Sequence, residues 1–515
     1  MKRVIASIDC GTQSMRALLF SQEGTLIDSE QVHYTPYFSD HPGWAEQDPE
    51  LLWSSLIKAL QAIKARNPET FHAICGVGIT TQRATMINVD EAGKPLRPAI
   101  TWLDQRKAEP AFKPPFPLGS ILAAAGVKRT LDKVQCEGKC NWIRQNQPDI
   151  WEKTHKYLQV SGFLNHRLTG VFADSSASQI GHIPFNYKSR TWSGRFTPPS
   201  LLFPVESEKL PTVMEPGEVL GHITAKAALE TGLKEGLPVI ACGSDKGCET
   251  LGMGVLDESR ASLSFGTTAT VQISTKRYFE PIRFMPPYPA PIPDHWNPEI
   301  EIFRGYWMIT WFKNEFAHQE VASALENGTA PEEEMDRLLE KAPAGAMGLV
   351  VQPYWGPGLD HPEAKGAMVG FGDVHKKEHV YKAVIEGLGY ALLEGLEKLE
   401  KKTGQRVKQL AVSGGASRSD QICQISADIM GRPLVRGCTT ETSGLGAAIV
   451  TAVGTGIYKD FQEAIGAMVQ YQTTFTPNPE RTRLYSKLYK RVYKKIFKRL
   501  SPIYRDIREI TGYPE

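Results

Sequence analysis

The chain has 515 residues, of which 41% are hydrophobic and 23% are charged, a composition typical of globular proteins. This length exceeds what one hydrophobic core usually holds, so we expect two large domains. The formal net charge of +2 is too small for a surface that makes the roughly 6–10 phosphate contacts of a nucleic-acid-binding protein. Nucleic acid is therefore not an expected partner.

The N-terminus superficially resembles a signal peptide, because an apolar stretch follows Met1-Lys2-Arg3. Asp9 interrupts this stretch early, so we expect a buried first strand instead. The longest run without charged residues, 442–458, is shorter than the ~20 apolar residues of a membrane-spanning helix, and no membrane partner is expected. The eight cysteines lack Cys-x-x-Cys spacing. We expect reduced, mostly buried thiols and a cytoplasmic location.

The first predicted elements form a β-hairpin around a Gly-Thr turn, and a second copy of this pattern follows half a chain later. Glycine permits close approach of the backbone to a ligand, and a threonine hydroxyl with successive N–H groups can face an oxyanion. A single such turn is more often an ordinary hairpin, but paired copies predict a clamp for a triphosphate. The two copies are Asp9-Cys10-Gly11-Thr12-Gln13-Ser14-Met15-Arg16, between strands 4–8 and 17–20, and Ser264-Phe265-Gly266-Thr267-Thr268-Ala269-Thr270-Val271, between strands 261–263 and 272–273.

Strands and helices then alternate, which indicates an α/β architecture. Asp48-Pro49 predicts a helix start, with Asp as N-cap and Pro in the first turn. A predicted strand over 74–79 ends in Thr80-Thr81-Gln82-Arg83, and another over 237–242 ends in Gly243-Ser244-Asp245. Polar residues at the carboxyl ends of strands are well placed to meet a ligand. The domain boundary is expected between residues 254 and 259.

Three proline-rich stretches, 110–117, 198–204 and 281–298, predict surface loops, because proline continues neither a helix nor a central strand. Further along, a predicted strand over 409–413 runs into Gly414-Gly415-Ala416-Ser417 and a helix over 420–430. This strand, glycine pair and helix start form a second arrangement suited to phosphate, although Gly-Gly turns are common.

Residues 481–499 combine a helical apolar stripe with many Lys and Arg residues. Basic amphipathic helices can bind membranes or acidic partners. We favour a closing helix that packs on its own domain and exposes its basic face to solvent.

Together these motifs resemble the FGGY family of carbohydrate kinases over almost the whole chain. The matching segments, in order, are Asp-x-Gly-Thr-x-Ser-x-Arg from Asp9, Gly43-Trp44-Ala45-Glu46-Gln47-Asp48-Pro49, Thr101-Trp102-Leu103-Asp104-Gln105-Arg106, Gly-x-Asp at 243–245, Ser-x-Gly-Thr from Ser264, and Ser-Gly-Gly-Ala-Ser from Ser413.

The resemblance implies an α/β fold of two duplicated actin-like ATPase (ribonuclease H-like) domains with a cleft between them. Residues 1–254 would be an N-terminal domain that mainly binds sugar, and residues 255–515 a C-terminal domain that mainly binds nucleotide. The implied reaction transfers the γ-phosphoryl group of ATP, with Mg²⁺, to a hydroxyl of a small sugar or polyol. A homodimer is possible by the same resemblance.

The same resemblance implies roles for individual residues. Asp245 is the candidate general base, although an Asp there taken alone is more often a helix N-cap. Asp9, with Asp245, is the candidate Mg²⁺ ligand. Arg16 has an alternative as a surface residue and Gln421 as an exposed helix residue. The candidate nucleotide contacts are Gly11, Thr12, Arg16, Gly266, Thr267, Gly414, Gly415, Ala416 and Gln421.

The acceptor pocket is predicted from Gln82, Arg83, Trp102, Asp104 and Asp245, although Trp102 has an alternative as a packing residue. Glycerol kinases carry Asn-Gln-Arg-Glu-Thr where this chain has Thr-Gln-Arg-Ala-Thr, so Ala84 replaces a carboxylate. Val134 lies near the place of a tyrosine that lines the glycerol pocket. The Gln-Met-His-Gly of xylulokinases is absent as well. Because a lost hydrogen-bonding group changes acceptor preference, we expect a ketopentose-like open-chain acceptor, with glycerol or another polyol as the alternative.

Two other classes are open to the same fold. An actin-like regulatory protein would bind nucleotide without transferring phosphate, and the presence of Asp9, Asp245 and both Gly-Thr turns favours the enzyme. An ATPase that resembles heat-shock chaperones would need a separate peptide-binding domain, for which no segment remains.

Overall fold

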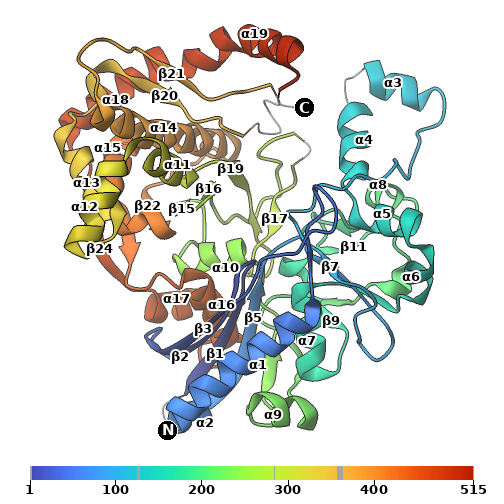
Figure 1. Cartoon of the computed structure of the whole chain (residues 1–515). Coiled ribbons are helices and arrows are strands. Elements are labelled where there is room, and N and C mark those ends of the chain that lie inside the picture. Colours follow the sequence, from blue (N-terminus) through green and yellow to red (C-terminus); the bar gives the residue numbers. More distant parts are fainter. Residues whose placement is uncertain (1–2, 125–127, 284, 357–362, 514–515) are drawn as a thin grey trace. The chain divides into compact units, whose positions relative to one another are not determined.

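The computed structural model describes residues 3–124, 128–283, 285–356 and 363–513 (Figure 1). Contacts along the chain divide it into two compact units. Unit 1 comprises Met1–Gly252, Tyr288–Trp296 and Glu441–Val469, and unit 2 comprises Met253–Pro287, Asn297–Thr440 and Gln470–Glu515. Two short segments from the second half of the sequence thus pack with the first unit, and no local pattern in the sequence indicates this.

Unit 1 is built on a six-stranded mixed sheet in the order β13-β14-β5-β1-β2-β3. Strand β1 pairs antiparallel with β2 and parallel with β5, and β14 is also parallel to β5. The carboxyl ends of β1, β5 and β14 therefore meet at one edge of the sheet. These strands are β1 (Val4–Cys10), β2 (Ser14–Ser21), β3 (Leu26–His33), β5 (Ile74–Thr81), β13 (Val219–His222) and β14 (Pro238–Ile240).

Unit 2 repeats this arrangement with a sheet in the order β19-β16-β15-β22-β23-β24. Strand β15 pairs antiparallel with β16 and parallel with β22, which is parallel to β23. Both predicted Gly-Thr hairpins are confirmed, and each opens its own sheet. The strands are β15 (Arg260–Phe265), β16 (Ala269–Gln272), β19 (Glu299–Ile302), β22 (Gln409–Ser413), β23 (Leu434–Gly437) and β24 (Tyr471–Phe475).

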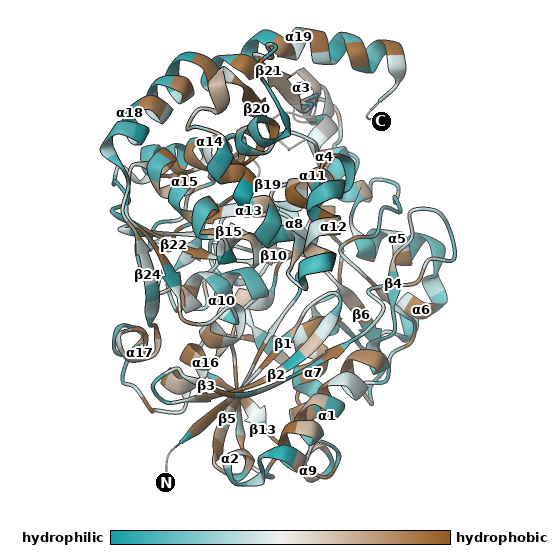
Figure 2. Cartoon of the chain, turned by 60° about the vertical axis from the view of Figure 1, so that its left-hand side comes forward, coloured by the Kyte–Doolittle hydropathy of each residue, from teal (hydrophilic) through white to brown (hydrophobic). Residues whose placement is uncertain are grey.

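Helices cover both faces of the sheet in unit 1. Helix α1 (Pro49–Arg66) begins as predicted, with the Asp48 side chain accepting a hydrogen bond from the Glu50 amide, and it packs in the core that contains Ala17 and Leu19. On the other face Leu18 faces Gly444 of α16 (Thr442–Gly454). Successive side chains of β2 point to opposite faces of the sheet and so pack against a helix on each face. Figure 2 shows the hydrophobic character of α16.

A second, smaller sheet in unit 1, in the order β4-β7-β6-β8, carries part of the family motifs. Its strands are β4 (Glu46–Gln47), β6 (Met86–Val89), β7 (Ala99–Ile100) and β8 (Lys156–Gln159), and the helices around the sheets of unit 1 include α7 (Val160–Thr169), α10 (Asp245–Gly252) and α17 (Phe461–Met468).

In unit 2 the 27-residue helix α14 (Lys377–Thr403) crosses the sheet. Gly395 lets it approach closely, since a Cβ there would lie 2.8 Å from Val271 and 3.0 Å from Ile300. The predicted helix α15 (Asp420–Met430) is also present, capped by the Ser419 side chain.

The predicted C-terminal helix consists of α18 (Pro479–Leu488), a π-helical turn over Tyr489–Tyr493 and α19 (Lys494–Thr511). Tyr485, Tyr489 and Tyr493 lie in the core of unit 2, so packing on its own domain is confirmed. Leu484 departs from the predicted apolar stripe, because its side chain is 40% exposed. Along α19 hydrophilic and hydrophobic residues alternate (Figure 2).

The loop predictions need two corrections. Residues 198–202 form the short helix α8 instead of a loop, because Pro198 and Pro199 occupy the first turn, where no amide hydrogen bond is needed. The stretch 281–298, of which Phe284 lies outside the described residues, is not all surface. Ala290 and Ile292 are buried, and β17 (Tyr288–Pro289) pairs with β18 (Trp296–Asn297). Residues 110–117 contain no helix or strand, as predicted.

All eight cysteines are free thiols, and Cys10, Cys140, Cys242, Cys248 and Cys423 are buried. Among the described residues, no helix has the length and apolar character needed to cross a bilayer.

Candidate active site

In unit 1 the carboxyl ends of three adjacent strands bring the predicted site residues together. Asp9 lies near the end of β1, Gln82 and Arg83 follow β5, and Asp245 follows β14 and opens helix α10. Thr81 and Ser244 form a parallel bridge that ties the ends of two of these segments together. Local strand signals placed each residue at a strand end, and the parallel pairing places those ends side by side.

Asp9 is a buried carboxylate that pairs with Arg16 across the hairpin. The Arg16 Nη1 lies 3.3 Å from Asp9 Oδ2 and 3.6 Å from Glu441 Oε2. Burial raises the pKa of Asp9 to about 7, against the lowering effect of Arg16, and the charges of Asp245 and Glu441 raise it further. The prediction for Arg16 left open a surface position, whereas this side chain is about one-third exposed and bridges two carboxylates.

Asp245 lies beside Arg83, with Arg83 Nε 3.8 Å from Asp245 Oδ1. Restricted solvation raises the pKa of Asp245, and the positive charges of Arg83 and Lys246 oppose this effect. About a third of the Asp245 side chain stays exposed, so a substrate can reach it. A carboxyl group whose pKa is perturbed by desolvation beside a specific charge partner is a candidate for a functional site.

Thr12 connects the phosphate turn of unit 1 to the predicted acceptor residues. Its hydroxyl donates a hydrogen bond to Gln82 Oε1 at 3.1 Å and accepts one from Trp102 Nε1 at 2.9 Å. Gln47 extends this network. Its Nε2 donates a hydrogen bond to the Thr12 carbonyl at 3.3 Å, and its Oε1 accepts one from Gln82 Nε2 at 3.2 Å. Trp102 is half exposed, so it is not the packing residue that the alternative proposed.

Asp104 differs from the other predicted acceptor residues. Its carboxylate accepts hydrogen bonds from the Ala45 amide at 2.7 Å and from Arg106, and it pairs with Arg106 Nη2 at 2.7 Å. Only 2% of the Asp104 side chain is exposed. This arrangement favours a structural role, and its contact with substrate stays a prediction.

Tyr288 and Lys246 lie in this site and were missed at the level of sequence. The Arg83 guanidinium carbon lies 5.4 Å from the centre of the Tyr288 ring, within the range of a cation–π contact. Lys246 forms an ion pair with Glu249 at 2.7 Å. The position of Lys246 directly after Asp245 was a usable signal, whereas nothing local indicates that Tyr288 packs with unit 1.

In unit 2 the Gly266–Thr267 turn is hydrogen-bonded to the segment that follows β19. The Gly266 carbonyl accepts a hydrogen bond from the Tyr306 amide at 3.0 Å. Gly305 is required there, since a Cβ would lie 2.2 Å from the Ala269 amide nitrogen. Thr267 is exposed, so its hydroxyl is available to a ligand.

A polar cavity of about 170 Å³ lies at the carboxyl ends of β22 and β23. Gly414, which has a φ of +88° and no room for a Cβ against Phe265, lines it. Arg418 and Arg436 bring positive charge to this wall and were not predicted as site residues. The cavity is lined by Val412, Ser413, Gly414, Ser417, Arg418, Arg436, Gly437, Cys438, Thr439, Thr440 and Gln472.

The remaining predicted nucleotide contacts lie outside the wall of this cavity. A Cβ at Gly415 would meet no atom within 4 Å, so the backbone there is open to approach. Ala416 follows it in a short 3₁₀ turn. Gln421 donates a hydrogen bond to Glu340 at 3.1 Å, which is consistent with the alternative of a helix-surface residue.

The residues present fit Mg²⁺ better than they fit a metal ion whose ligands all come from protein side chains. Among the described residues, no group of three or more His, Cys, Asp and Glu side chains is arranged to hold a metal ion. Mg²⁺ usually meets one or two carboxylates and completes its shell with water and phosphate oxygens. Asp9 and Asp245, the two predicted ligands, would supply that number, and the charge of Asp245 contributes to the raised pKa of Asp9.

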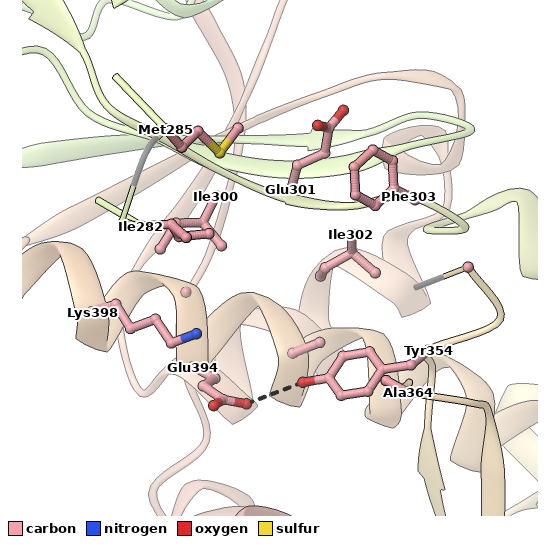
Figure 3. A pocket seen from close by; sticks show the side chains of 13 residues that line it. Ile282, Met285, Ile300, Glu301, Ile302, Phe303, Tyr354, Ala364, Glu394 and Lys398 are labelled. Carbon is pink, nitrogen blue, oxygen red and sulfur yellow. Dashed lines mark hydrogen bonds between the residues drawn. The ribbon is translucent and has the colours of Figure 1, made fainter. Parts of the chain in front are cut away.

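A separate, mainly apolar cavity of about 80 Å³ lies in unit 2 between β19 and α14 (Figure 3). Ile300 and Ile302 face it from the strand, and Glu394 accepts a hydrogen bond from Tyr354 at 3.4 Å at its edge. None of its lining residues is a predicted site residue, and it has no part in the site described above.

The duplicated sheets, each with a Gly-Thr turn at the ends of parallel strands, define an actin-like, two-domain ATPase fold. The N-terminal domain of the FGGY family of carbohydrate kinases matches residues 4–252, and the C-terminal domain of that family matches residues 261–455. The chain belongs to the FGGY family of carbohydrate kinases.

Individual relatives agree with this assignment. The chain is 28% identical to the uncharacterized sugar kinase YgcE of Escherichia coli (strain K12), over 94% of this chain and 91% of that protein. It is 25% identical to a xylulose kinase of Lactococcus lactis, over 94% of each.

Solved structures show the same fold. A gluconate kinase from Lactobacillus acidophilus superposes with a TM-score of 0.83 at 21% identity, over 98% of this chain and 100% of that one. A Plasmodium falciparum glycerol kinase solved with ADP gives 0.76 at 19% identity, over 96% and 98%. Because the chain belongs to the FGGY family, the protein is a carbohydrate kinase, a phosphotransferase of a family that uses ATP.

Proposed function

We propose that the protein transfers the γ-phosphoryl group of ATP to a hydroxyl of a small open-chain sugar, with a ketopentose as the first choice. The observation that carries this proposal is the pair formed by Asp245 and Arg83, 3.8 Å apart at the strand ends of unit 1. A carboxylate at this position can accept the proton of an acceptor hydroxyl, and the guanidinium beside it can bind an oxygen of the acceptor. The named xylulose kinase among the relatives supports the choice of a ketopentose.

The proposed reaction is a direct transfer of the γ-phosphoryl group from ATP to the acceptor. The acceptor oxygen forms a bond to the γ-phosphorus while its proton passes to Asp245. The bond from that phosphorus to the bridging oxygen breaks, and its electron pair leaves with ADP. Arg83 holds the acceptor beside Asp245. Gln82 and Trp102 are the further proposed acceptor contacts, and the Trp102 ring would pack against the acceptor, because its one N–H already donates to Thr12. Since phosphoryl transfer depends on positioning and charge stabilisation, no covalent intermediate with the protein is required.

The phosphate contacts are proposed for each unit separately. In unit 1 they are Gly11, Thr12 and Arg16. In unit 2 they are Gly266 and Thr267, with Gly414, Gly415, Ala416 and Gln421 toward the α-phosphate and adenosine. Bound Mg²⁺, held by Asp9 and Asp245, would neutralise charge on the phosphate oxygens.

Glycerol or another polyol is the second candidate acceptor, because glycerol kinases are among the relatives of similar sequence. Ala84 argues against glycerol itself. Its φ of +55° and the hydrogen bond from its amide to the Ile180 carbonyl fix it in a constrained turn beside Arg83, yet it offers no carboxylate to a hydroxyl. An open-chain acceptor that needs no carboxylate at this point fits better.

The test is acceptor-dependent formation of ADP from ATP. The panel is D-xylulose, L-xylulose, both ribuloses, glycerol, erythritol and several aldoses, with Asp245→Asn as the blank. We expect one ketopentose to give the highest kcat/KM, and Asp245→Asn to lower kcat by about 10²–10⁴-fold while ADP binding persists. Asp257→Asn, an exposed carboxylate in unit 2, is the matched control.

Nucleotide binding without acceptor-dependent turnover across the panel would favour the regulatory, non-transferring alternative. Full activity of Asp245→Asn would remove Asp245 from the role of base. A homodimer and a cytoplasmic location stay predictions.

A further inference from the structure

A buried carboxylate outside the acceptor and nucleotide residues remains without a role. Asp174, on β9 (Ala173–Ser175), is 1% exposed. Its Oδ2 accepts hydrogen bonds from Ser161 Oγ and Gln179 Nε2, both at 2.7 Å. Its Oδ1 accepts from Asn165 Nδ2 at 3.2 Å and from the Ser175 amide at 2.8 Å.

This arrangement is selective for a carboxylate. Four donors converge on two oxygens, and an ionised carboxylate is the one common side-chain group that only accepts. Burial raises the pKa of Asp174 to about 6, and the hydrogen bonds from the four uncharged donors oppose the rise. Burying a carboxylate is costly unless it is hydrogen-bonded, and the four hydrogen bonds to Asp174 meet that requirement.

The segment that Asp174 fixes reaches the loop before Asp245 through two hydrogen bonds. Ser175 Oγ donates to the Cys242 carbonyl at 2.5 Å. Two residues further along each of these two segments, the Ser244 amide donates to the Ala177 carbonyl at 3.1 Å. Residues 242 and 244 are thus both tied to residues 175–177.

Packing leaves this loop little freedom to shift. A Cβ on Gly243 would lie 3.0 Å from Pro291 Cβ and 3.3 Å from Ala177 Cβ. Gln179 Nε2 also donates to the Ser175 carbonyl at 3.2 Å. The Gln179 side chain therefore links the Asp174 carboxylate to the backbone of Ser175. The path from Asp174 to the first turn of α10 therefore runs entirely through buried groups of unit 1.

We propose that Asp174 is a positioning residue for Asp245. Its carboxylate orders residues 175–179, and these hold the Cys242–Ser244 loop so that the Asp245 side chain points to the acceptor. Asp174 touches no reacting atom. The inference rests on the proposed function in one respect, namely that Asp245 is the base, and the hydrogen bonds stand independently of it.

The experiment compares Asp174→Asn and Ser175→Ala with the wild type. Asp174→Asn keeps the shape but places an amide donor among donors, and Ser175→Ala removes the hydrogen bond to Cys242 while leaving Asp174 in place. Ser54→Ala, which loses a hydroxyl bond to the Leu51 carbonyl in α1, is the matched control. If Asp174→Asn does not fold, Gln179→Ala, which removes one donor to Asp174 Oδ2 and the hydrogen bond to the Ser175 carbonyl, takes its place in the test.

Two readouts are measured on each full-length variant: kcat and KM with the preferred acceptor, and hydrogen–deuterium exchange over 242–248. We expect kcat to fall by about tenfold or more with KM for ATP within about twofold, as for a displaced catalytic group. The Ser244 amide should exchange faster in both variants and not in Ser54→Ala. The double variant should be no worse than the more severe single variant, because both changes interrupt one path.

The proposal is overturned if kcat stays within about twofold of the wild type in both single variants, or if exchange over 242–248 is unchanged. Failure of the proposed function looks different. The wild type would then show no acceptor-dependent turnover, and the exchange data would still decide whether Asp174 orders the loop.

Discussion

The indole Nε1 of Trp102 lies 2.9 Å from the hydroxyl oxygen of Thr12, and these residues are 90 positions apart in the sequence. One belongs to the predicted acceptor site and the other to the predicted phosphate turn. The hydrogen bond therefore joins the two halves of the proposed reaction within unit 1.

Trp102→Phe should weaken catalysis more than folding. The change keeps a ring at a half-exposed position and removes the hydrogen bond to Thr12. Because a typical hydrogen bond contributes roughly 1 kcal/mol, we expect kcat/KM for the acceptor to fall about fivefold. Steady-state kinetics measure this. Trp192→Phe, which loses an indole hydrogen bond to the Pro211 carbonyl, should leave kcat/KM unchanged, and equal losses in the two variants would contradict the prediction.

Arg106→Met should destabilise the protein strongly. The guanidinium is 3% exposed, pairs with Asp104 at 2.7 Å and Glu46 at 2.8 Å, and lies 3.9 Å from the centre of the Trp44 ring. Removing one member of a buried ion network leaves the others uncompensated, so we expect a loss of about 3–5 kcal/mol in the free energy of unfolding.

Urea denaturation compares this variant with Arg66→Met. Arg66 also pairs with two carboxylates, Asp28 at 2.7 Å and Glu30 at 2.9 Å, but its side chain is 48% exposed. Exposed pairs contribute at most about 1 kcal/mol. If the two variants lost the same free energy, the network around Arg106 would not be the cause.

Gly446→Ala should disrupt the packing of α10 on α16. A Cβ at Gly446 would lie 1.9 Å from the Cys248 carbonyl oxygen. We expect a loss of about 3 kcal/mol or more, because backbone must move to relieve the overlap. Asp245 opens α10, so kcat should fall as well. Thermal denaturation and kinetics test both effects.

Gly466→Ala is the matched control for this packing. Gly466 lies in α17, and a Cβ there would meet no atom within 4 Å. Replacing a helical glycine at an open position stabilises by about 0.4–1 kcal/mol. A destabilised Gly466→Ala would show that the loss in Gly446→Ala does not depend on the contact with Cys248.

Glu386→Gln should change the pH dependence of stability. Burial raises the pKa of Glu386 to about 7, while the Gly345 amide, Tyr485 and the charge of Lys382 lower it. The folded state thus holds the proton more tightly than the unfolded state, whose carboxyl has a pKa near ~4.3. The stability contributed by this group is full below about pH 4 and is lost as pH rises to about 7.

Glu386→Gln removes this loss of stability at higher pH, because the amide does not titrate. Both hydrogen bonds to Glu386, from Gly345 and Tyr485 at 2.9 Å, reach the same oxygen, Oε1, which the amide retains. Relative to the wild type, the variant should gain on the order of 3 kcal/mol between pH 4.5 and 7.5, measured by urea denaturation at both values. Glu326→Gln, on the surface of the same unit, should show no such gain, and a pH-independent difference for Glu386→Gln would refute the assignment.

The sequence by itself determined the local elements and the identity of the chemical groups. Turn residues and strand periodicity act over a few positions, so the two Gly-Thr hairpins and the Asp48 cap were predictable. The proline pair 198–199 shows the limit of such local reasoning, because proline both interrupts a helix and begins one.

Only the tertiary structure decided which distant groups meet. Asp104 and Trp102 belong to the same sequence motif. The Asp104 carboxylate is buried in an ion pair with Arg106, whereas the Trp102 indole is hydrogen-bonded to Thr12. Tyr288 and Gly446 come from the second half of the chain and pack in unit 1. Side-chain contacts between residues far apart depend on how whole helices and sheets fit, and that fit is a property of the packed core rather than of any window of sequence.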